Sequence, residues 1–453
     1  MGTVCKRWAR AQRRNNLLPI EELREVSTPQ LECALDELGE IAGKLNMVEM
    51  VTAVNHNTER DKWLELARQG KFTTPHLEYN VNLLKDAVAK KTAVEKAAAN
   101  ITAACAGLPA TVVGGDLRAL ANNRVAEVNS MISAADAILR KDALTAGRKM
   151  IALYGLPTDV KEVKRIIDAH RNGSPVATAQ PIYSTEERDK LARVQLDAEA
   201  LRKLYVWVAR RYGIADSRPV VVSDQATSPD VRDVSSEGPI VVIPADFTLK
   251  GTSAAAHVIH EVGCHWRDSE NVQRLLPKVG AGALKPVDEL LYEGHATWEG
   301  RRVNLCVNGQ VKLSRAFYYP VAIHYAYHNE ALFAETARYL YDFIKSEDVP
   351  VEQTLDNVWR VTYRVYRGNP QMERRSGYVY TKDRAYFQGR QLAQELKDAG
   401  LGYLLNYGTL AMRDLAILVN HFKMVPQGGF PYPEEPVLYR EICTKLLKGE
   451  SFT

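Results

Sequence analysis

A short run with two histidines and a glutamate is the part of this sequence with the clearest chemical potential. It reads His-Glu-Val-Gly-Cys-His at residues 260–265. Imidazole nitrogens are common zinc ligands, and a carboxylate beside them can act on a water molecule. In the common zinc-protease pattern the two histidines are four residues apart, so both lie on one face of an α-helix. Here they are five residues apart, and an ideal helix would separate them by about 140°.

A local widening of the helix would bring the two imidazoles together again. A π-helical turn, whose hydrogen bonds join residues i and i+5, returns both rings to the same side. Gly263 lies between the histidines and accepts distorted backbone angles. Upstream, the apolar run at residues 239–244 is bounded by prolines, which is typical of a strand. We therefore expect a strand whose edge holds a peptide substrate, followed by a metal-binding helix with a bulge.

The third metal ligand is expected on a later element, because catalytic zinc sites use three protein ligands and leave the fourth position for water. Glu293, which lies 28 residues after His265, is the predicted ligand. Glu289, His295 and Glu299 belong to the same stretch and are alternatives that helical periodicity does not separate.

Two further patterns have spacings that could bind a metal. Cys264 lies four residues after His260 and needs no bulge, but the other cysteines have no Cys-x-x-Cys spacing to complete such a site. This pairing remains an alternative. His324 and His328 also have helical spacing, yet no acid lies between them and aromatic residues precede them. We expect that second pair to belong to a packed core.

Three separate blocks of this sequence resemble one family of zinc peptidases. They are the hexapeptide at residues 260–265, the pentapeptide Tyr-Glu-Gly-His-Ala at residues 292–296, and residues 377–389. In this order they resemble the zinc tyrosine carboxypeptidases, whose animal members remove the terminal tyrosine of α-tubulin and whose bacterial relatives carry a Gln-Glu-Gly-Leu-Ala motif. The resemblance covers about residues 185–435. Tyr292 departs from the family, which has Gln or Glu at this position.

The resemblance implies a role for each residue of the first two blocks. His260, His265 and Glu293 would bind Zn²⁺, and Glu261 would be the general base. In such hydrolases zinc lowers the pKa of its bound water and polarises the scissile carbonyl group. A neighbouring carboxylate takes the proton from that water and passes it to the leaving amine.

A carboxypeptidase must also bind the free carboxylate of its substrate, which requires a nearby cation. Lys382 and Tyr386 belong to the third block and are the first candidates for substrate binding. Arg367, in a cationic stretch just before a glycine, is the next. Such a cluster suits an acidic peptide, because it attracts anions and loses that advantage as salt rises. The predicted function is removal of a C-terminal tyrosine from an acidic tail, with α-tubulin or microtubules as the expected partner.

Two other functions remain open. Peptidases of the dipeptidyl-peptidase type also use the His-Glu-x-x-x-His pattern, but they need an acidic pocket for the substrate's amino group. The cationic residues at 367–382 do not supply one. A non-catalytic scaffold could instead bind microtubules through the N-terminal region, with zinc structural or absent.

Composition places few limits on function. A net charge of +4 is too small to indicate nucleic-acid binding. No run of about 18 apolar residues predicts a membrane span. The cysteines are few and scattered, and the N-terminus lacks a secretory apolar segment. We expect a cytoplasmic protein, associated with the cytoskeleton if microtubules are its partner.

The pattern along the chain predicts a helical N-terminal region at residues 1–172 and a linker at 173–183. A catalytic domain is expected at residues 184–435 and a C-terminal tail helix at 436–453. Ser184 begins a capping box whose helix should continue to about residue 211. The expected fold is α+β and predominantly helical, with a zincin-like catalytic domain that has a small sheet beside its metal-binding helices.

Overall fold

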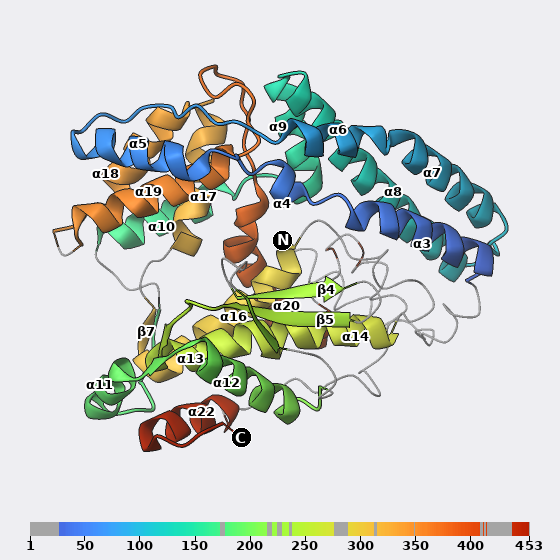
Figure 1. The fold of residues 1–453 in the computed structure, drawn as a ribbon. Helices are drawn as coiled ribbons and strands as arrows, with labels where there is room; N and C mark the ends of the chain where they lie inside the picture. Colours follow the sequence, from blue (N-terminus) through green and yellow to red (C-terminus); the bar gives the residue numbers. More distant parts are fainter. Residues whose placement is uncertain are drawn as a thin grey trace.

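The architecture is predominantly helical with a small sheet, which confirms the predicted α+β class (Figure 1). A computed structural model describes the chain at residues 27–172, 177–214, 220–223, 229–234, 238–275, 289–311, 315–347, 349–407, 411, 414 and 437–452. Among the helices of these residues, none combines the length and the apolar character that a membrane span requires.

The helices up to residue 172 are α3 (Pro29–Gly43), α4 (Met47–Met50), α5 (His56–Arg68), α6 (Val81–Ala89), α7 (Lys91–Ala106), α8 (Val112–Leu139), α9 (Ala143–Tyr154) and α10 (Val160–Arg171). The next elements are β1 (Ala177–Thr178), α11 (Thr185–Arg193), β2 (Gln195–Leu196), α12 (Ala198–Arg211), β3 (Val220–Ser223), β4 (Asp230–Val234), β5 (Gly238–Pro244) and β6 (Leu249–Lys250).

The remaining elements include two π-helical segments, η1 and η3, and two 3-10 segments, η2 and η4. In chain order they are α13 (Gly251–Val258), η1 (Ile259–Trp266), α14 (Arg267–Leu275), α16 (Leu290–Asn308), β7 (Gln310–Val311), α17 (Arg315–His328), α18 (Phe333–Ile344), α19 (Val351–Tyr366), η2 (Lys382–Arg384), η3 (Ala385–Gly389), α20 (Arg390–Asp398), η4 (Gly402–Tyr407) and α22 (Val437–Lys448).

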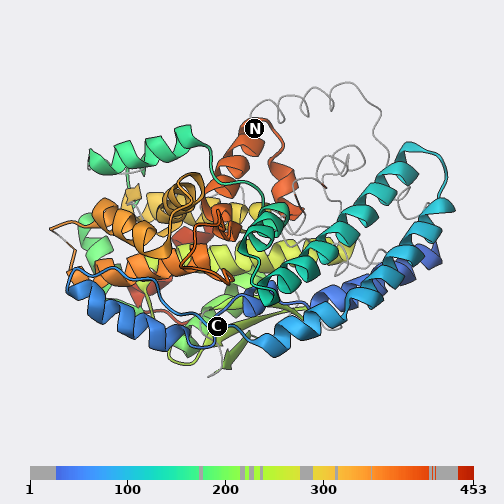
Figure 2. The same cartoon turned by 90° about the horizontal axis from the view of Figure 1, so that it is seen from above.

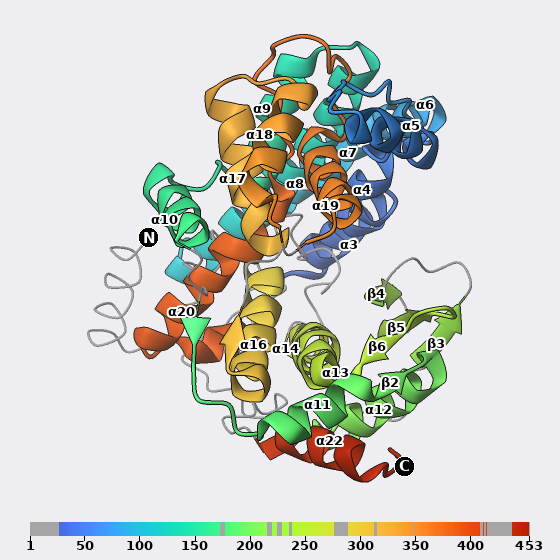
Figure 3. The ribbon, with the colours of Figure 1, turned by 90° about the vertical axis from the view of Figure 1, so that its left-hand side faces the viewer.

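The elements form two groups, which Figure 3 shows one above the other. Helices α3 to α10 lie with α17, α18 and α19 in one group, and α3, α7 and α8 run side by side in Figures 1 and 2. The strands lie with α11, α12, α13, α14, α16, α20 and α22 in the other group. Segment η3 packs against both α16 and α17, so the two groups meet at η3.

The predicted capping box is present at the start of α11. The backbone N–H of Glu187 donates to Ser184 Oγ at 3.2 Å, and Glu187 Oε2 accepts from the Ser184 N–H at 2.8 Å. The single helix predicted to residue 211 is wrong, because the chain divides into α11 and α12. Between them β2 pairs with β6, and the side chain of Asp197 caps α12.

The strand predicted at residues 239–244 is present as β5, but it is not an edge strand. The sheet order is β3-β5-β4, with β3 parallel and β4 antiparallel to β5. Val241 is paired with Val220 on one side and with Val231 on the other. The expectation that the edge of this strand holds a peptide is therefore wrong. An apolar run that is buried along its length is typical of a central strand, and Val241, Val242 and Ile243 are buried.

Residues from the N-terminal helices and from the region after residue 315 share hydrophobic cores. Trp63 of α5 packs against Trp359 of α19, with ring centroids 5.5 Å apart, and against Phe333 of α18. Tyr378 and Tyr380 belong to the core of α3, α7, α8 and α9. The N-terminal helices thus help to fix the segment that precedes η2, and the domain boundary predicted at residues 173–183 remains a prediction.

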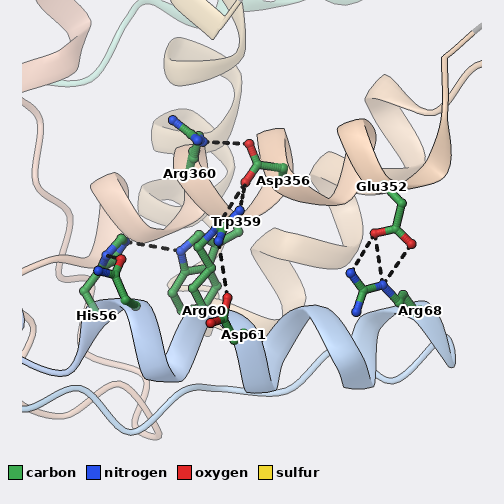
Figure 4. A network of polar contacts seen from close by, with 9 residues as sticks. His56, Arg60, Asp61, Arg68, Glu352, Asp356, Trp359 and Arg360 are labelled. Carbon is green, nitrogen blue, oxygen red and sulfur yellow. Dashed lines mark hydrogen bonds and ion pairs between the residues drawn. The ribbon is translucent and has the colours of Figure 1, made fainter. Parts of the chain in front are cut away.

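A polar network reinforces the contact between α5 and α19 (Figure 4). Arg60 Nη2 lies 2.6 Å from Asp356 Oδ1, and Arg68 Nη2 lies 2.8 Å from Glu352 Oε2. The second pair is exposed to solvent, which weakens its attraction. We therefore expect the aromatic core beneath these pairs to supply most of the stability of the contact.

Replacing the buried ring of α5 tests this expectation. Trp63→Ala should lower the free energy of unfolding by about 3–5 kcal/mol, because it leaves a large cavity. Arg68→Ala on the same helix is the control and should change the free energy of unfolding little. Urea denaturation measures both, and equal effects of the two substitutions would contradict the shared core.

Candidate metal centre

The two histidines lie on one helical run that widens in its middle. Segments α13, η1 and α14 follow one another without a break from Gly251 to Leu275. At the end of η1 the N–H of Arg267 donates to the carbonyl of Val262, which is the i to i+5 bond of a π-helix. The predicted bulge is therefore confirmed.

The bulge brings the two imidazoles together beside a carboxylate. The Nε2 atoms of His260 and His265 are 3.2 Å apart, and the rings are perpendicular. Glu293 Oε2 lies 3.8 Å from His260 Nε2 and 3.7 Å from His265 Nε2. The three predicted ligands thus converge on one point from η1 and α16.

Gly263 has a different role from the expected one. Its backbone is not in the left-handed region, so the bulge does not depend on unusual backbone angles at this position. A Cβ atom at Gly263 would instead lie 2.6 Å from the hydroxyl oxygen of Tyr212. The glycine is needed because Tyr212, at the end of α12, approaches η1 closely.

The alternative third ligands are engaged elsewhere. Glu289 Oε2 lies 2.9 Å from Lys382 Nζ, and His295 Nδ1 lies 2.8 Å from Asp268 Oδ2. Glu299 accepts a hydrogen bond from Arg302, one turn later on α16, at 2.9 Å. Glu293 is therefore the member of this stretch that faces both imidazoles.

Cys264 has the properties of a core residue. Its side chain is buried, and burial raises the pKa of the thiol well above its usual value. Because the thiolate and not the thiol binds metals, this environment disfavours the alternative site with His260. His324 and His328 have ring centroids 4.3 Å apart within α17, whose neighbouring side chains form packed cores.

Glu261 is the second carboxylate at the cluster. The ligand atoms of His260, Glu261 and His265 lie within 4.8 Å of one another. Glu261 Oε1 is 3.9 Å from the nearer imidazole, whereas Glu293 is almost equally close to both. This difference favours Glu293 as the ligand and leaves Glu261 beside it, where a general base is needed.

The electrostatics of the cluster suit a cation. Burial alone would raise the pKa of Glu293, but its contact with His265 and the positive charges around it lower that pKa to about 2. Burial and the neighbouring His265 lower the pKa of His260 to about 3. Burial opposes protonation of His265, but Glu293 outweighs it and raises the pKa. A metal ion would therefore meet a neutral imidazole at His260 and a carboxylate at Glu293.

These donors fit Zn²⁺. In a tetrahedral site with bonds of about 2.0–2.1 Å, neighbouring ligand atoms are roughly 3.3 Å apart. The separations of 3.2, 3.7 and 3.8 Å between the three donor atoms are close to this value. Two imidazoles and a carboxylate are also a common ligand set of catalytic zinc.

Helix α16 orients both imidazoles as well as supplying Glu293. The ring of Tyr292 stacks on His265 with centroids 3.8 Å apart. The backbone of Ala296 forms a hydrogen bond with the ring of His260. Contacts of this kind fix the direction in which an imidazole presents its ligand nitrogen. Sequence reasoning missed the role of Tyr292, because an aromatic side chain carries no metal-binding signal.

Two glycines allow α16 and η3 to touch. A Cβ at Gly294 would lie 2.2 Å from the carbonyl carbon of Gly389, and a Cβ at Gly389 would lie 1.9 Å from the Leu290 oxygen. The close approach brings Tyr386 of η3 to the metal cluster. The charge of Glu293, followed by burial, raises the pKa of the Tyr386 phenol well above its usual value.

The other two residues predicted for substrate binding, Lys382 and Arg367, are close enough for the charge of one to affect the pKa of the other. Lys382 is paired with Glu289, and its charge contributes to the low pKa of Glu293. The guanidinium of Arg367 is buried and lies 4.5 Å from the ring centroid of Tyr380. The cations expected to bind an acidic substrate are therefore largely enclosed by the protein.

A cavity of about 390 Å³ opens onto the cluster. His260, Glu261 and Tyr386 line it, whereas Lys382 and Arg367 are not among its described lining residues. His257 also lines it, and burial lowers the pKa of that imidazole to about 4. Two arginines, Arg301 and Arg390, also line it; sequence reasoning missed both, because neither belongs to a motif.

The glycine contact between α16 and η3 can be tested by one added methyl group. Gly294→Ala should lower the free energy of unfolding by about 1–3 kcal/mol or more, since backbone atoms must separate. It should also weaken Zn²⁺ binding, because Glu293 is the adjacent residue. Gly300→Ala in the same helix is the control, with its nearest contact at 3.5 Å. Denaturation and zinc titration measure both, and similar behaviour of the two variants would refute the role of the contact.

No protein-family model and no curated protein sequence matches this chain. One solved structure, described as "the putative lipoprotein from Colwellia psychrerythraea", aligns with 86% of this chain and 73% of its own chain. The TM-score is 0.35 and the sequence identity is 11%. A similarity of this size carries no argument about fold or function.

Proposed function

We propose that this protein is a zinc metallocarboxypeptidase that removes a C-terminal tyrosine from an acidic protein tail. The observation that carries the proposal is the convergence of His260, His265 and Glu293 with Glu261 beside them. The bulged helix, the second ligand helix and the adjacent small sheet are consistent with a zincin-like domain. The α-tubulin tail, and hence a cytoplasmic site of action on microtubules, is proposed from the sequence resemblance.

Zn²⁺ held by His260, His265 and Glu293 would supply a Lewis acid that acidifies water and polarises a carbonyl group. Glu261 is placed to take the proton of the attacking water and to deliver it to the leaving amine. Its carboxylate lies 3.9 Å from His260 Nε2 and lines the cavity in which a peptide end would bind.

Tyr386 is placed to donate a hydrogen bond to the oxygen that becomes negative during the reaction. Its phenol stays protonated because Glu293 and burial raise the pKa. Arg364 forms a hydrogen bond with Tyr386 and lies 2.5 Å from Asp383, so this arginine positions the phenol. Donors of this kind stabilise the transition state more than the bound substrate.

The charge of the cavity distinguishes the peptidase classes. A dipeptidyl peptidase must bind the amino group of its substrate with acidic residues. Arg301 and Arg390 line this cavity, and cations suit the carboxyl end of a peptide instead. This observation favours the carboxypeptidase over the peptidase that acts from the amino end.

Substitution of the proposed base tests the reaction. Glu261→Gln should keep stoichiometric zinc and lose roughly 10²- to 10⁴-fold in the rate of tyrosine release, because the amide cannot accept the proton. The substrate is a peptide ending in Glu-Glu-Tyr, and the loss of tyrosine is followed by mass spectrometry. Near wild-type activity of the variant, or release of dipeptides from the amino end by the wild type, would refute the proposal.

Metal analysis provides the matched controls. Glu293→Gln should lose zinc, because a proposed ligand is removed. His257→Ala should retain zinc: His257 lies one helical turn before His260 but is outside the donor cluster. A wild-type protein that takes up no zinc would instead support a non-catalytic scaffold.

The proposed role of the phenol gives a separate test. Tyr386→Phe should lower kcat by roughly 10²- to 10³-fold with unchanged zinc content, because the hydrogen bond to the developing negative charge is lost. Tyr318→Phe, which removes a half-buried hydroxyl outside the cavity, is the control and should keep the wild-type rate. Steady-state kinetics measure both variants. Unchanged kcat for Tyr386→Phe would exclude this role.

A further inference from the structure

The cavity beside the metal cluster is lined by cations as well as by the proposed catalytic groups. His260 and Glu261 line it from η1, Arg301 lines it from α16, and Arg390 lines it from the start of α20. Its volume of about 390 Å³ is in the range of sites that enclose small ligands, roughly 300–1,000 Å³. A single amino-acid residue at the end of a peptide is a ligand of suitable size.

Arg390 is a buried cation for which the described residues supply no anionic partner. Its side chain is 6% exposed, and its guanidinium lies 4.5 Å from the ring centroid of Phe317 and 5.1 Å from that of Phe387. Within the described parts of the chain no hydrogen bond or ion pair involves this guanidinium. Burial, together with the charge of Arg301, lowers its pKa to about 9.

Two other buried arginines in the described parts of the chain are paired with carboxylates, whereas the buried Arg367 contacts the ring of Tyr380 and is not among the residues that line the cavity. Arg124 contacts Glu127 and Asp414, and Arg267 Nη2 lies 3.0 Å from Asp268 Oδ1. An unpaired buried charge costs free energy, so an anion that enters the cavity gains more from Arg390 than from a solvated cation. The position of Arg390 in the cavity, with no carboxylate beside it among the described residues, therefore points to a ligand with a negative charge.

The position of Arg390 relative to the metal cluster restricts the size of this ligand. Arg390 follows Tyr386 by four residues across the π-helical segment η3, whose turns contain somewhat more than four residues, so the two lie on nearly the same side of the helical run and about one turn apart. Tyr386 is the residue whose phenol feels the charge of Glu293, and both line the cavity. An anion on Arg390 would be about one amino-acid residue away from the bond that Glu261 serves.

We propose that Arg390, with Arg301 beside it, binds the free α-carboxylate of the substrate's terminal residue. Phe317 and Leu249 line the same cavity and would contact the side chain of that residue. The assignment rests on the proposed carboxypeptidase function. It places the carboxylate site at these two arginines, outside the Lys382 and Arg367 cluster, and it accounts for the removal of one residue at a time.

The test compares a peptide ending in Glu-Glu-Tyr as the free acid and as the C-terminal amide. The wild type should prefer the acid by roughly a hundredfold in kcat/KM, since the amide leaves a buried guanidinium unpaired. Arg390→Met should reduce this preference to less than threefold, and Arg390→Lys should retain part of it. Arg202→Met, which removes an exposed arginine paired with Glu199 on α12, should keep the full preference.

A binding measurement without turnover keeps the proposal testable if activity is low. Calorimetry should show that the wild type binds N-acetyltyrosine at least tenfold more tightly than N-acetyltyrosinamide, and that Arg390→Met binds both equally. Thermal unfolding and zinc content must match the wild type in each variant. A wild type without preference for the acid, or an Arg390→Met variant that keeps it, would overturn the carboxylate site. Failure of the proposed function would appear differently, as no tyrosine release from either peptide.

Discussion

A single widened helical turn in η1 is the constraint on which the candidate site depends. With ordinary α-helical geometry His260 and His265 would point in different directions, and no carboxylate could face both. A π-helical segment is rare because its backbone hydrogen bonds are strained relative to those of an α-helix. Here burial of Val262 and Trp266 on the same segment, and the contact of both imidazoles with Glu293, offset that cost. The bulge thus allows Val262 and Trp266 to be buried and also sets the positions of the two imidazoles.

Close backbone contacts at glycines hold the other elements against this turn. Gly263 admits the hydroxyl of Tyr212, and Gly294 lies against Gly389 where α16 meets η3. Packed interiors tolerate little displacement, so these contacts fix η1 against the end of α12 and fix α16 against η3. Tyr386 reaches the cluster because of that contact, although it is distant from the histidines in sequence.

The charges around the site are distributed unevenly. Lys382 is neutralised by Glu289, and Arg364 is neutralised by Asp383. Arg390 lines the cavity, and its charge has no such neighbour among the described residues. In a buried environment of low polarity, the presence or absence of a neighbouring opposite charge changes the free energy of a cation more than it does in water. Paired cations orient the catalytic groups, whereas Arg390 lies in the cavity where a substrate can reach it.

The sequence by itself determined the local features of this protein: the helical and strand segments, the capping box at Ser184, the bulge at residues 260–265 and the general α+β class. These depend on neighbouring residues, whose spacing and backbone preferences can be read directly. The tertiary structure decided which carboxylate faces the imidazoles, because Glu289, Glu293 and Glu299 are equivalent on an isolated helix and differ only in what packs against them. It also placed β5 in the centre of its sheet and Arg390 in the cavity. Such outcomes depend on contacts between distant segments, which no local pattern specifies.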